Sequence, residues 1–374
     1  SPSAAGPPGA HACARPALSE AMPAPPLSAT GRVAARGTFL ERAGWGGAEI
    51  RPLAGDASFR RYDRVRLGAS QAVLMDAPPD REDIAPFLAV DGLLRSVGLS
   101  APEVLAADRE LGFILLEDLG DSLFTPLAQD RGREAEIYAA AVDLLAALHG
   151  HTAAGMPALA ALPPQDHALL TAGLDTFLDW YWPAAFGRAA AADLRRDFLD
   201  RWAPLLELVR PGDRPDPGRD VLVMRDFHAD NLIWLPERQG VARVGLLDFQ
   251  DAVLGHPAYD LVSLLDDVRR DVAADLAGRL RDRYLAAAGL HAGSPERSHF
   301  ETGYAIFGAQ RNIRILGVFV RLWQRDGKAR YLDYLPRTWA MLDRSLRHPA
   351  LAPVADWFAA HLPPVARRLE GGAS

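Results

Sequence analysis

The chain has 374 residues, of which 49% are hydrophobic and 24% charged, and its formal net charge is −7. This length is enough to bury a core in two lobes or two domains. The negative charge and the lack of a basic block argue against nucleic acid or an anionic membrane as a partner. No apolar run is long enough to span a bilayer, and Cys13 is the only cysteine. The composition therefore predicts a soluble, cytoplasmic protein without a disulfide framework.

Residues 1–36 are rich in Ala, Pro, Ser and Gly without periodicity, which predicts a disordered or loosely packed segment. Residues 37–118 contain a helical piece, two strand candidates separated by a turn at Gly68, a second helix and a further strand pair. From 119 to 374 helical periodicity dominates, interrupted by strand-like stretches around residue 226. We predict an α+β fold with two lobes: a small mixed lobe bearing an antiparallel sheet, and a large, mainly helical lobe.

The segment "MRDFHADN" places polar side chains between two apolar, strand-like runs, "DVLVM" and "LIWL". Polar residues on loops at strand ends can be aimed at a ligand by a rigid scaffold. Asp226 and Asn231 have the spacing D-x-x-x-x-N, and Asp248 ends the next strand candidate. An Asp and an Asn so spaced also occur in ordinary turns, where both side chains bond to local backbone.

Phosphoryl transfer from ATP needs an acceptor for the attacking hydroxyl's hydrogen bond and hard oxygen ligands for Mg²⁺. We predict that Asp226 is the catalytic base and contacts the acceptor, and that Asn231 and Asp248 bind Mg²⁺. His228 and Asp230 could hold a transition metal, but the sequence offers no third ligand at a suitable spacing. We therefore expect these two side chains to make local hydrogen bonds.

Several segments resemble the aminoglycoside phosphotransferase-like kinases, which have the protein-kinase-like fold. The likeness is closest to the bacterial anomeric kinases of N-acetylmuramate and N-acetylglucosamine, which act in cell-wall recycling. The matching segments span most of the chain after residue 37: "GDASFRRY" (55–62), "VLMDAPP" (73–79), "LLEDLGD" (115–121), "FHADNLIWL" (227–235), "VGLLDFQDAVLGHPAYDLVSLL" (244–265) and "RLWQRDGKARYLDYLPR" (321–337).

The resemblance implies an ATP- and Mg²⁺-dependent kinase that phosphorylates the anomeric hydroxyl of an N-acetylated amino sugar in peptidoglycan recycling. It implies that residues 37–118 bind nucleotide, that a hinge near Glu117 contacts adenine through its backbone, and that Asp260 braces the catalytic loop. The residues expected to contact the nucleotide are Gly55, Ser58, Phe59, Arg60, Arg61, Glu117 and Leu119.

The sequence departs from the general kinase pattern at the third strand, where Asp76 replaces the lysine that pairs with the phosphates. The only lysine in the chain is Lys328. Arg60 and Arg61 are the nearest cations, and adjacent strand residues point to opposite faces. Either arginine is a candidate for the missing charge, and both can equally be solvated surface residues.

The acceptor site is expected on residues 119–374, beside the catalytic loop. Arg311 falls on the apolar stripe of a helix over 300–323, where a guanidinium needs a carboxylate from the protein or the substrate. Asp179 and Trp180 offer a polar group and a flat apolar face for a sugar ring, whereas Tyr181 shares a core stripe. Gln250 and Asp251 follow the metal-binding Asp248 and can bind sugar hydroxyls.

Two other functions fit parts of the sequence. A kinase of cationic acceptors, such as an aminoglycoside, choline or ethanolamine, would need a pocket rich in carboxylates or aromatic rings. A nucleotide-binding pseudokinase would explain the missing third-strand lysine, although Asp226, Asn231 and Asp248 are all present. Our first expectation is a monomeric kinase that binds a small amino-sugar substrate.

Overall fold

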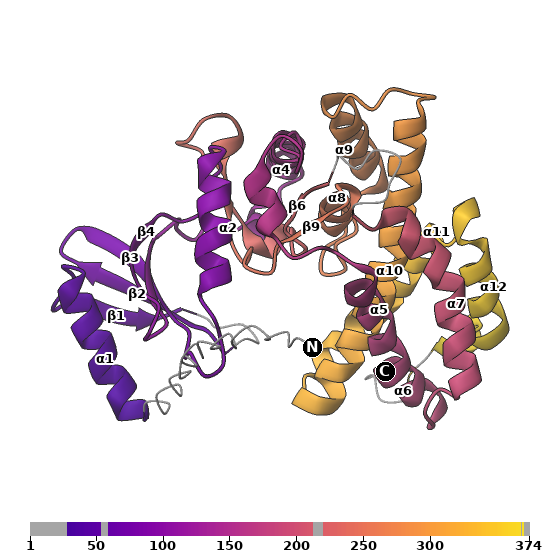
Figure 1. The fold of residues 1–374 in the computed structure, drawn as a ribbon, viewed down its shortest axis with the longest axis horizontal. Helices are drawn as coiled ribbons and strands as arrows, with labels where there is room; N and C mark the ends of the chain where they lie inside the picture. The colour runs from indigo at the N-terminus through magenta and orange to yellow at the C-terminus, as the bar shows by residue number, and fades with distance from the viewer. Residues whose placement is uncertain (1–27, 54–58, 212–219, 368, 370–374) are drawn as a thin grey trace, which may run out of the picture.

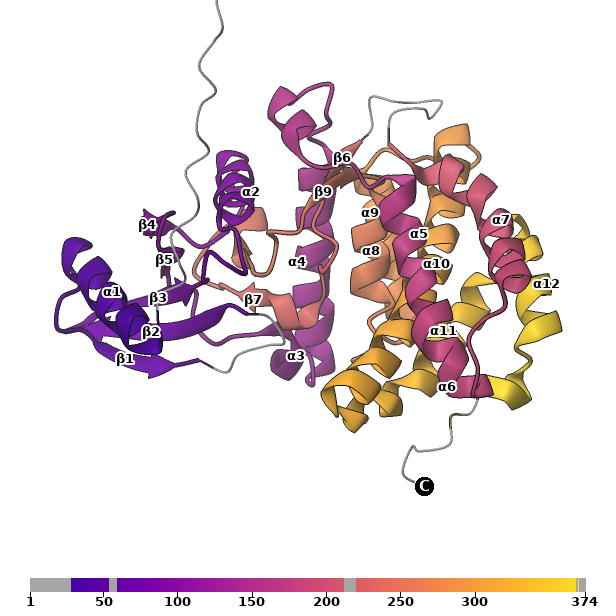
Figure 2. The same ribbon diagram turned by 60° about the horizontal axis from the view of Figure 1, so that its bottom comes forward.

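The computed structural model describes residues 28–53, 59–211, 220–367 and 369. The predicted nucleotide contacts Gly55 and Ser58 lie outside this described part. The chain forms a sheet-bearing N-lobe and a larger helical C-lobe (Figures 1 and 2), as the sequence predicts.

The N-lobe is built on one antiparallel sheet with strand order β1-β2-β3-β5-β4. The predicted hairpin is confirmed, because Leu67 of β2 lies opposite Ser70 of β3 across the turn at Gly68. Helix α1 covers one face of the sheet, and α2 packs against the other face toward the C-lobe (Figure 1). The elements are α1 (Ala29–Arg42), β1 (Glu49–Pro52), β2 (Arg61–Leu67), β3 (Ser70–Asp76), α2 (Ala85–Ser96), β4 (Val104–Asp108) and β5 (Phe113–Glu117).

The predicted boundary at residue 37 is wrong, because α1 begins at Ala29 with Ser28 as its N-cap. Arg32 of this helix binds Asp76, with Nε 2.7 Å from Oδ1, and Arg36 binds Asp63 at 3.0 Å. These ion pairs attach the first turns of α1 to the sheet. Because arginine and alanine supply the contacts there, this part of the helix has no apolar periodicity for a sequence pattern to detect.

The C-lobe holds most of the helices and two short two-stranded sheets, β6-β9 and β7-β8. Its first elements are α3 (Phe124–Leu127), α4 (Arg131–His149), α5 (His167–Thr176), a π-helical turn (Phe177–Tyr181), α6 (Trp182–Phe186) and α7 (Ala192–Val209). The strands are β6 (Val221–Val223), β7 (Leu232–Trp234), β8 (Val244–Leu246) and β9 (Val253–Gly255). The remaining helices are α8 (Ala258–Leu265), α9 (Ala274–Ala287), α10 (Pro295–Asp326), α11 (Leu335–Ser345) and α12 (Ala352–His361).

Helix α10 is the central element of the C-lobe, and it contacts α5, α7, α8 and α11 (Figure 2). Arg311 is buried, as its place on the apolar stripe predicts, but its neighbours Gln310 and Asn312 are buried too. The Gln310 amide donates to the Leu170 carbonyl of α5 at 2.8 Å, so this polar side is covered by another helix. Among the described residues, no helix is both long and apolar enough to cross a membrane.

Gly112, in the turn between β4 and β5, offers a test of the N-lobe packing. Its φ is +69°, and a Cβ there would lie 1.9 Å from the carbonyl oxygen of Ala77. We expect Gly112→Ala to lower the free energy of unfolding by about 2–4 kcal/mol, because both a left-handed backbone and a clash with main chain are imposed. The measurement is the midpoint of urea unfolding.

Gly98→Ala is the matched control for this substitution. Gly98 has a φ of +80°, but a Cβ added there meets nothing within 4 Å. Only the backbone penalty of about 1–2 kcal/mol applies. Equal losses for the two variants would contradict the packing described for the β4–β5 turn.

Candidate active site

The catalytic loop follows β6 and is held by a buried carboxylate from α8. Asp260 is fully buried, and its two oxygens accept the backbone N–H groups of Met224 at 2.6 Å and Arg225 at 2.9 Å. Arg225 has a φ of +68°, which turns the chain sharply before Asp226. Burial raises the pKa of Asp260 to about 7, against the opposing effect of the two N–H donors. The bracing role that the resemblance implies for Asp260 is therefore confirmed by the contacts.

Asn231 and Asp248 lie at the same end of the β7–β8 hairpin. The Leu247 backbone N–H donates to the Asn231 carbonyl at 3.0 Å, which places Asp248 one residue from this contact. The Asn231 amide nitrogen donates to the Asp226 carbonyl at 2.9 Å, so the same side chain ties the hairpin to the catalytic loop. These contacts bring the two chain segments that carry the three predicted residues side by side.

Asp248 itself sits in a strained position with its carboxylate exposed. Its φ is +55°, and its side chain is 45% exposed. The next residue, Phe249, is fully buried and packs on Phe87 of α2, with ring centroids 4.9 Å apart. A buried anchor beside an exposed carboxylate aims that carboxylate out of the core. The Gln250 amide donates to Asp248 at 2.7 Å, so Gln250 orients this group.

The donor set at this site suits Mg²⁺. Asn231 donates through its amide nitrogen, and this leaves the amide oxygen as the group that can face a cation. Asp248 adds a solvent-facing carboxylate. Amide and carboxylate oxygens are the hard ligands that Mg²⁺ takes, and the ion keeps several waters when it binds to one or two carboxylates. Among the described residues, no group of three or more His, Cys, Asp or Glu side chains forms another metal site.

Arginines surround Asp226 and keep it ionised. Burial alone would raise the pKa of this carboxyl, but the nearby charges of Arg311, Arg314, His228 and Arg225 lower it below its ordinary value. An ionised carboxylate can accept the hydrogen bond of an attacking hydroxyl.

Arg311 lies at the centre of this charged group. Burial disfavours its charged form, yet the Tyr259 hydroxyl and the Asp226 and Asp267 carboxylates raise its pKa. Its guanidinium carbon lies 5.9 Å from the centre of the Tyr259 ring, and its Nε has no hydrogen-bond partner among the described residues.

His228 makes the expected local contact, whereas the contacts of Asp230 come from residues distant in the sequence. The Thr125 hydroxyl donates to Asp230, and Arg269 lies 3.8 Å from the same carboxylate. His228 is buried, and its Nε2 lies 3.5 Å from the Asn231 amide nitrogen. The pKa of His228 is lowered, and burial is the largest cause.

Arg60 and Arg61 point to opposite sides of the N-lobe sheet. Arg61 lies opposite Asp76 in the β2–β3 register, and Asp76 faces Arg32 of α1, away from the C-lobe. Arg60 faces the C-lobe. Its Nη1 lies 3.9 Å from Asp248 and its Nε 3.7 Å from Glu82, and its side chain is 11% exposed. Of the two candidates, Arg60 is therefore the cation placed beside the predicted metal site.

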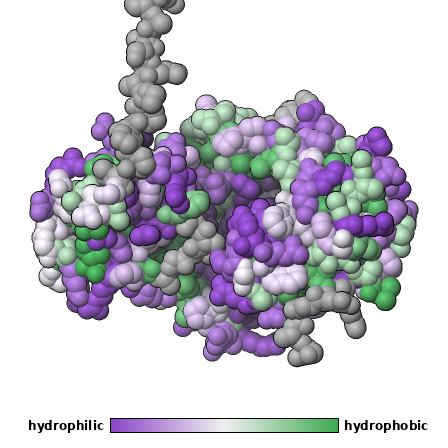
Figure 3. Space-filling model, turned by 90° about the horizontal axis from the view of Figure 1, so that it is seen from below, coloured by the Kyte–Doolittle hydropathy of each residue, from purple (hydrophilic) through white to green (hydrophobic). Residues whose placement is uncertain are grey.

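The hinge is fastened to both lobes by ion pairs. Glu117 binds Arg238 of the C-lobe, and Leu119 packs with Ile233 and Leu235. The next residue, Asp118, accepts from Arg64 of β2 at 2.6 Å, and this pair lowers the pKa of the carboxyl against the effect of burial. The surface between the lobes is hollowed (Figure 3), and Arg60 and Asp248 approach each other across this boundary.

The other predicted contacts occupy varied places. Phe59 is 58% exposed, with the Arg81 guanidinium 4.8 Å from its ring centre. Asp251 is exposed in the turn after Gln250. Asp179 binds Arg195 of α7, and Trp180 packs partly buried against the C-lobe core. Tyr181 is fully buried, which confirms its expected place in the core.

Sequence reasoning missed two residues of this region. Glu82, which pairs with Arg60, lies in a loop that carries no recognisable motif. Arg314 lies close enough to Asp226 to lower its pKa. The signal that could have identified Arg314 is its position one turn after Arg311 on the same helix.

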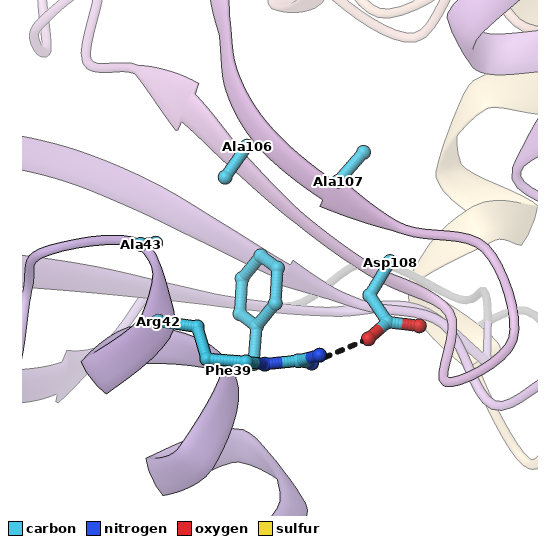
Figure 4. Close-up of a pocket in the computed structure, with 6 residues that line it drawn as sticks. All are labelled: Phe39, Arg42, Ala43, Ala106, Ala107 and Asp108. Atoms are coloured by element: carbon cyan, nitrogen blue, oxygen red, sulfur yellow. Dashed lines mark hydrogen bonds and ion pairs between the residues drawn. The ribbon is translucent and has the colours of Figure 1, made fainter.

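A separate depression of about 200 Å³ lies on the outer side of the N-lobe (Figure 4). Arg42 of α1 bridges to Asp108 of β4 across it, at 2.6 Å. The sheet separates this depression from the catalytic loop, so it contributes nothing to the site described above.

The comparisons with known proteins agree with this geometry. The model of the phosphotransferase enzyme family matches residues 49–300. An N-acetylmuramate/N-acetylglucosamine kinase from Caulobacter vibrioides is 41% identical, over 90% of this chain and 98% of that protein. A protein of the same name from Pseudomonas aeruginosa is 36% identical, over 84% of this chain and 90% of the relative.

Among solved structures, the GDP complex of a mutant aminoglycoside 2′-phosphotransferase IIIa has a TM-score of 0.57 at 14% sequence identity. The match covers 83% of this chain and 97% of that one, and it confirms the protein-kinase-like fold. Family model, relatives and fold all agree, and the chain belongs to the phosphotransferase enzyme family.

Proposed function

We propose that this protein is an ATP-dependent kinase of N-acetylated amino sugars that phosphorylates the anomeric hydroxyl of N-acetylmuramate, N-acetylglucosamine or both. The observation that supports the proposal is that Asp226, Asn231 and Asp248 lie on two adjoining segments, which are joined by one side-chain and one backbone hydrogen bond. The relatives named N-acetylmuramate/N-acetylglucosamine kinase support the choice of acceptor. A sugar 1-phosphate produced in this way would serve the reuse of cell-wall sugars.

The phosphoryl transfer forms one P–O bond and breaks another. The anomeric oxygen attacks the γ-phosphorus, the bond to the β-phosphate oxygen breaks, and ADP leaves. Asp226 accepts the hydrogen bond of the attacking hydroxyl and takes its proton as the new bond forms. The arginines around Asp226 keep it ionised before the step. Mg²⁺, when held by Asn231 and Asp248, would neutralise charge on the phosphates.

Arg60 replaces the lysine of the third strand in this proposal. Its guanidinium lies beside Asp248 and pairs with Glu82. In this position the positive charge can bind the phosphates of the nucleotide. Arginine keeps its charge at every physiological pH and offers several donors in a fixed plane. The hinge backbone near Glu117 and Leu119 is the proposed contact of adenine.

The charges around Asp226 disfavour a cationic acceptor. Arg225, Arg311 and Arg314 all lie close enough to lower the pKa of Asp226. An aminoglycoside or choline would meet like charge there, which costs binding energy. An inactive pseudokinase is disfavoured by the complete set of Asp226, Asn231 and Asp248 and by relatives named as kinases.

Asp226→Asn tests the catalytic role. We expect kcat to fall at least about 100-fold, because the amide cannot take the proton of the hydroxyl. The assay follows ADP release and identifies the phosphorylated sugar by mass. Asp230→Asn is the control from the same loop, since Asp230 contacts Thr125 and Arg269. Equal loss in both variants would argue against a specific role for Asp226.

The 1-O-methyl glycoside of N-acetylglucosamine tests the position of transfer. This compound lacks the anomeric hydroxyl, and we expect no turnover with it. Phosphorylation of the glycoside would contradict transfer to the anomeric oxygen. Turnover of aminoglycosides alone would overturn the choice of acceptor, and turnover of no acceptor would favour a binding module.

Arg60→Gln, with Arg61→Gln as its control, tests the replacement of the lysine. We expect Arg60→Gln to lower kcat/KM for ATP about 10- to 100-fold, because a charge beside the phosphates is lost. Arg61 lies on the opposite face of the sheet, and its substitution should alter the value less than about twofold. A larger effect of Arg61→Gln would show that the strand presents the other arginine to the nucleotide.

A further inference from the structure

Two arginines on α10 lack a carboxylate partner. Elsewhere in the described part of the chain, several partly buried arginines face Asp or Glu, as in Arg32, Arg64, Arg195, Arg238 and Arg367. Arg314 and Arg321 are also partly buried, yet neither has an ion pair within 4.0 Å among the described residues. The Nε of Arg321 is buried and makes no hydrogen bond there.

These two arginines lie on one face of α10. Residues 314 and 321 are two turns apart, and helical side chains lean toward the N-terminus, so the side chain of Arg321 leans toward Arg314. Burial and the charges of Arg325 and Arg314 lower the pKa of Arg321. An anion placed between the two guanidinium groups would offset their repulsion.

The position of this pair relates it to the acceptor. Arg314 lies one turn after Arg311 on α10, and the Arg311 guanidinium carbon lies 5.9 Å from the ring centre of Tyr259. Tyr259 precedes Asp260, whose carboxylate holds the loop that carries Asp226, the proposed contact of the attacking hydroxyl. The nucleotide side of the site is served by Arg60 and Asp248, on the N-lobe and the β7–β8 hairpin. An anion held by Arg314 and Arg321 would therefore be a group of the acceptor sugar. This group would be displaced from the reacting hydroxyl in the direction of the α10 axis.

Helix α5 packs beside the part of α10 that carries Arg314. A Cβ added to Gly173 would lie 3.2 Å from Cδ of Arg314, so the glycine leaves room for the arginine stem. Farther along, Gly317 packs on the backbone of Thr176 and Phe177. The segment that contains Gly173 and Phe177 runs in the same direction as α10. Trp180 therefore lies at roughly the same height along α10 as Arg321. An aromatic face near the second arginine suits a sugar ring whose substituent carries the charge.

We infer that Arg314 and Arg321 form a carboxylate-binding subsite that favours an amino sugar with an acidic substituent, such as the lactyl group of N-acetylmuramate, over neutral N-acetylglucosamine. The inference rests on the proposed sugar kinase activity. It assigns the preference between the two acceptors to a pair of residues outside the catalytic loop, whereas Asp226 serves both sugars alike.

Arg321→Gln is the sharpest test, because Arg321 is the member of the pair farther from Asp226. The quantity to measure is kcat/KM for N-acetylmuramate divided by kcat/KM for N-acetylglucosamine. We expect this ratio to fall about 10- to 100-fold, the loss typical of a hydrogen bond to a charged group. Arg321→Lys should restore part of the ratio. Arg325→Gln, one turn farther on and paired with Asp326, is the control and should leave the ratio within about twofold.

The methyl ester of N-acetylmuramate is an independent probe. It keeps the size of the lactyl group and removes its charge, so the wild-type enzyme should lose about the same factor with the ester as Arg321→Gln loses with the acid. The ester should gain nothing further from the substitution. An equal fall with both sugars in Arg321→Gln, or an unchanged ratio, would overturn the subsite. If the wild-type protein phosphorylates neither sugar, the proposed function itself fails, which is a separate and distinguishable result.

Discussion

The catalytic loop depends on the buried carboxylate of Asp260. Its two hydrogen bonds to the backbone of Met224 and Arg225 fix the turn that presents Asp226. Burying a carboxylate is costly, and the two N–H donors with the charge of Arg311 nearby offset part of that cost. From this fixed turn, the Asn231 side chain reaches back to the Asp226 carbonyl, and the Asn231 carbonyl holds Leu247 beside Asp248. One buried charge thereby sets the geometry of all three proposed catalytic and metal-binding residues.

Arginine supplies nearly all the positive charge of this chain, and the role of each arginine depends on the groups around it. On the outer face of the N-lobe, Arg32 binds Asp76 and fastens α1 to the sheet. On the inner face, Arg60 meets Asp248 and Glu82 where kinases of this fold class carry lysine on the adjacent strand. In the C-lobe, Arg314 and Arg321 have no carboxylate within 4.0 Å among the described residues. The same residue type thus fastens a helix and, as we propose, faces the nucleotide and the substrate.

The motif residues could be predicted from sequence because their chemistry fixes their spacing along the chain. Asp226 and Asn231 share one loop, and Asp248 ends the next hairpin, so local sequence largely determines their proximity. The β2–β3 hairpin was predictable for the same reason, since its turn contains Gly68. The start of α1 was not predictable, because its contacts are ion pairs to Asp63 and Asp76 rather than an apolar stripe. The choice between Arg60 and Arg61 depended on the register of β2 and on which face α1 covers, and neither is a local property.

The account centres on one divalent ion held jointly by the catalytic loop and the β7–β8 hairpin. Electron paramagnetic resonance of Mn²⁺, bound with a non-hydrolysable ATP analogue, measures this directly. The account predicts a bound ion whose affinity falls at least about tenfold in Asp248→Ala and in Asn231→Ala, but stays the same in Asp230→Ala. Unchanged Mn²⁺ affinity in both Asp248→Ala and Asn231→Ala would show that these residues do not share an ion and would contradict the account.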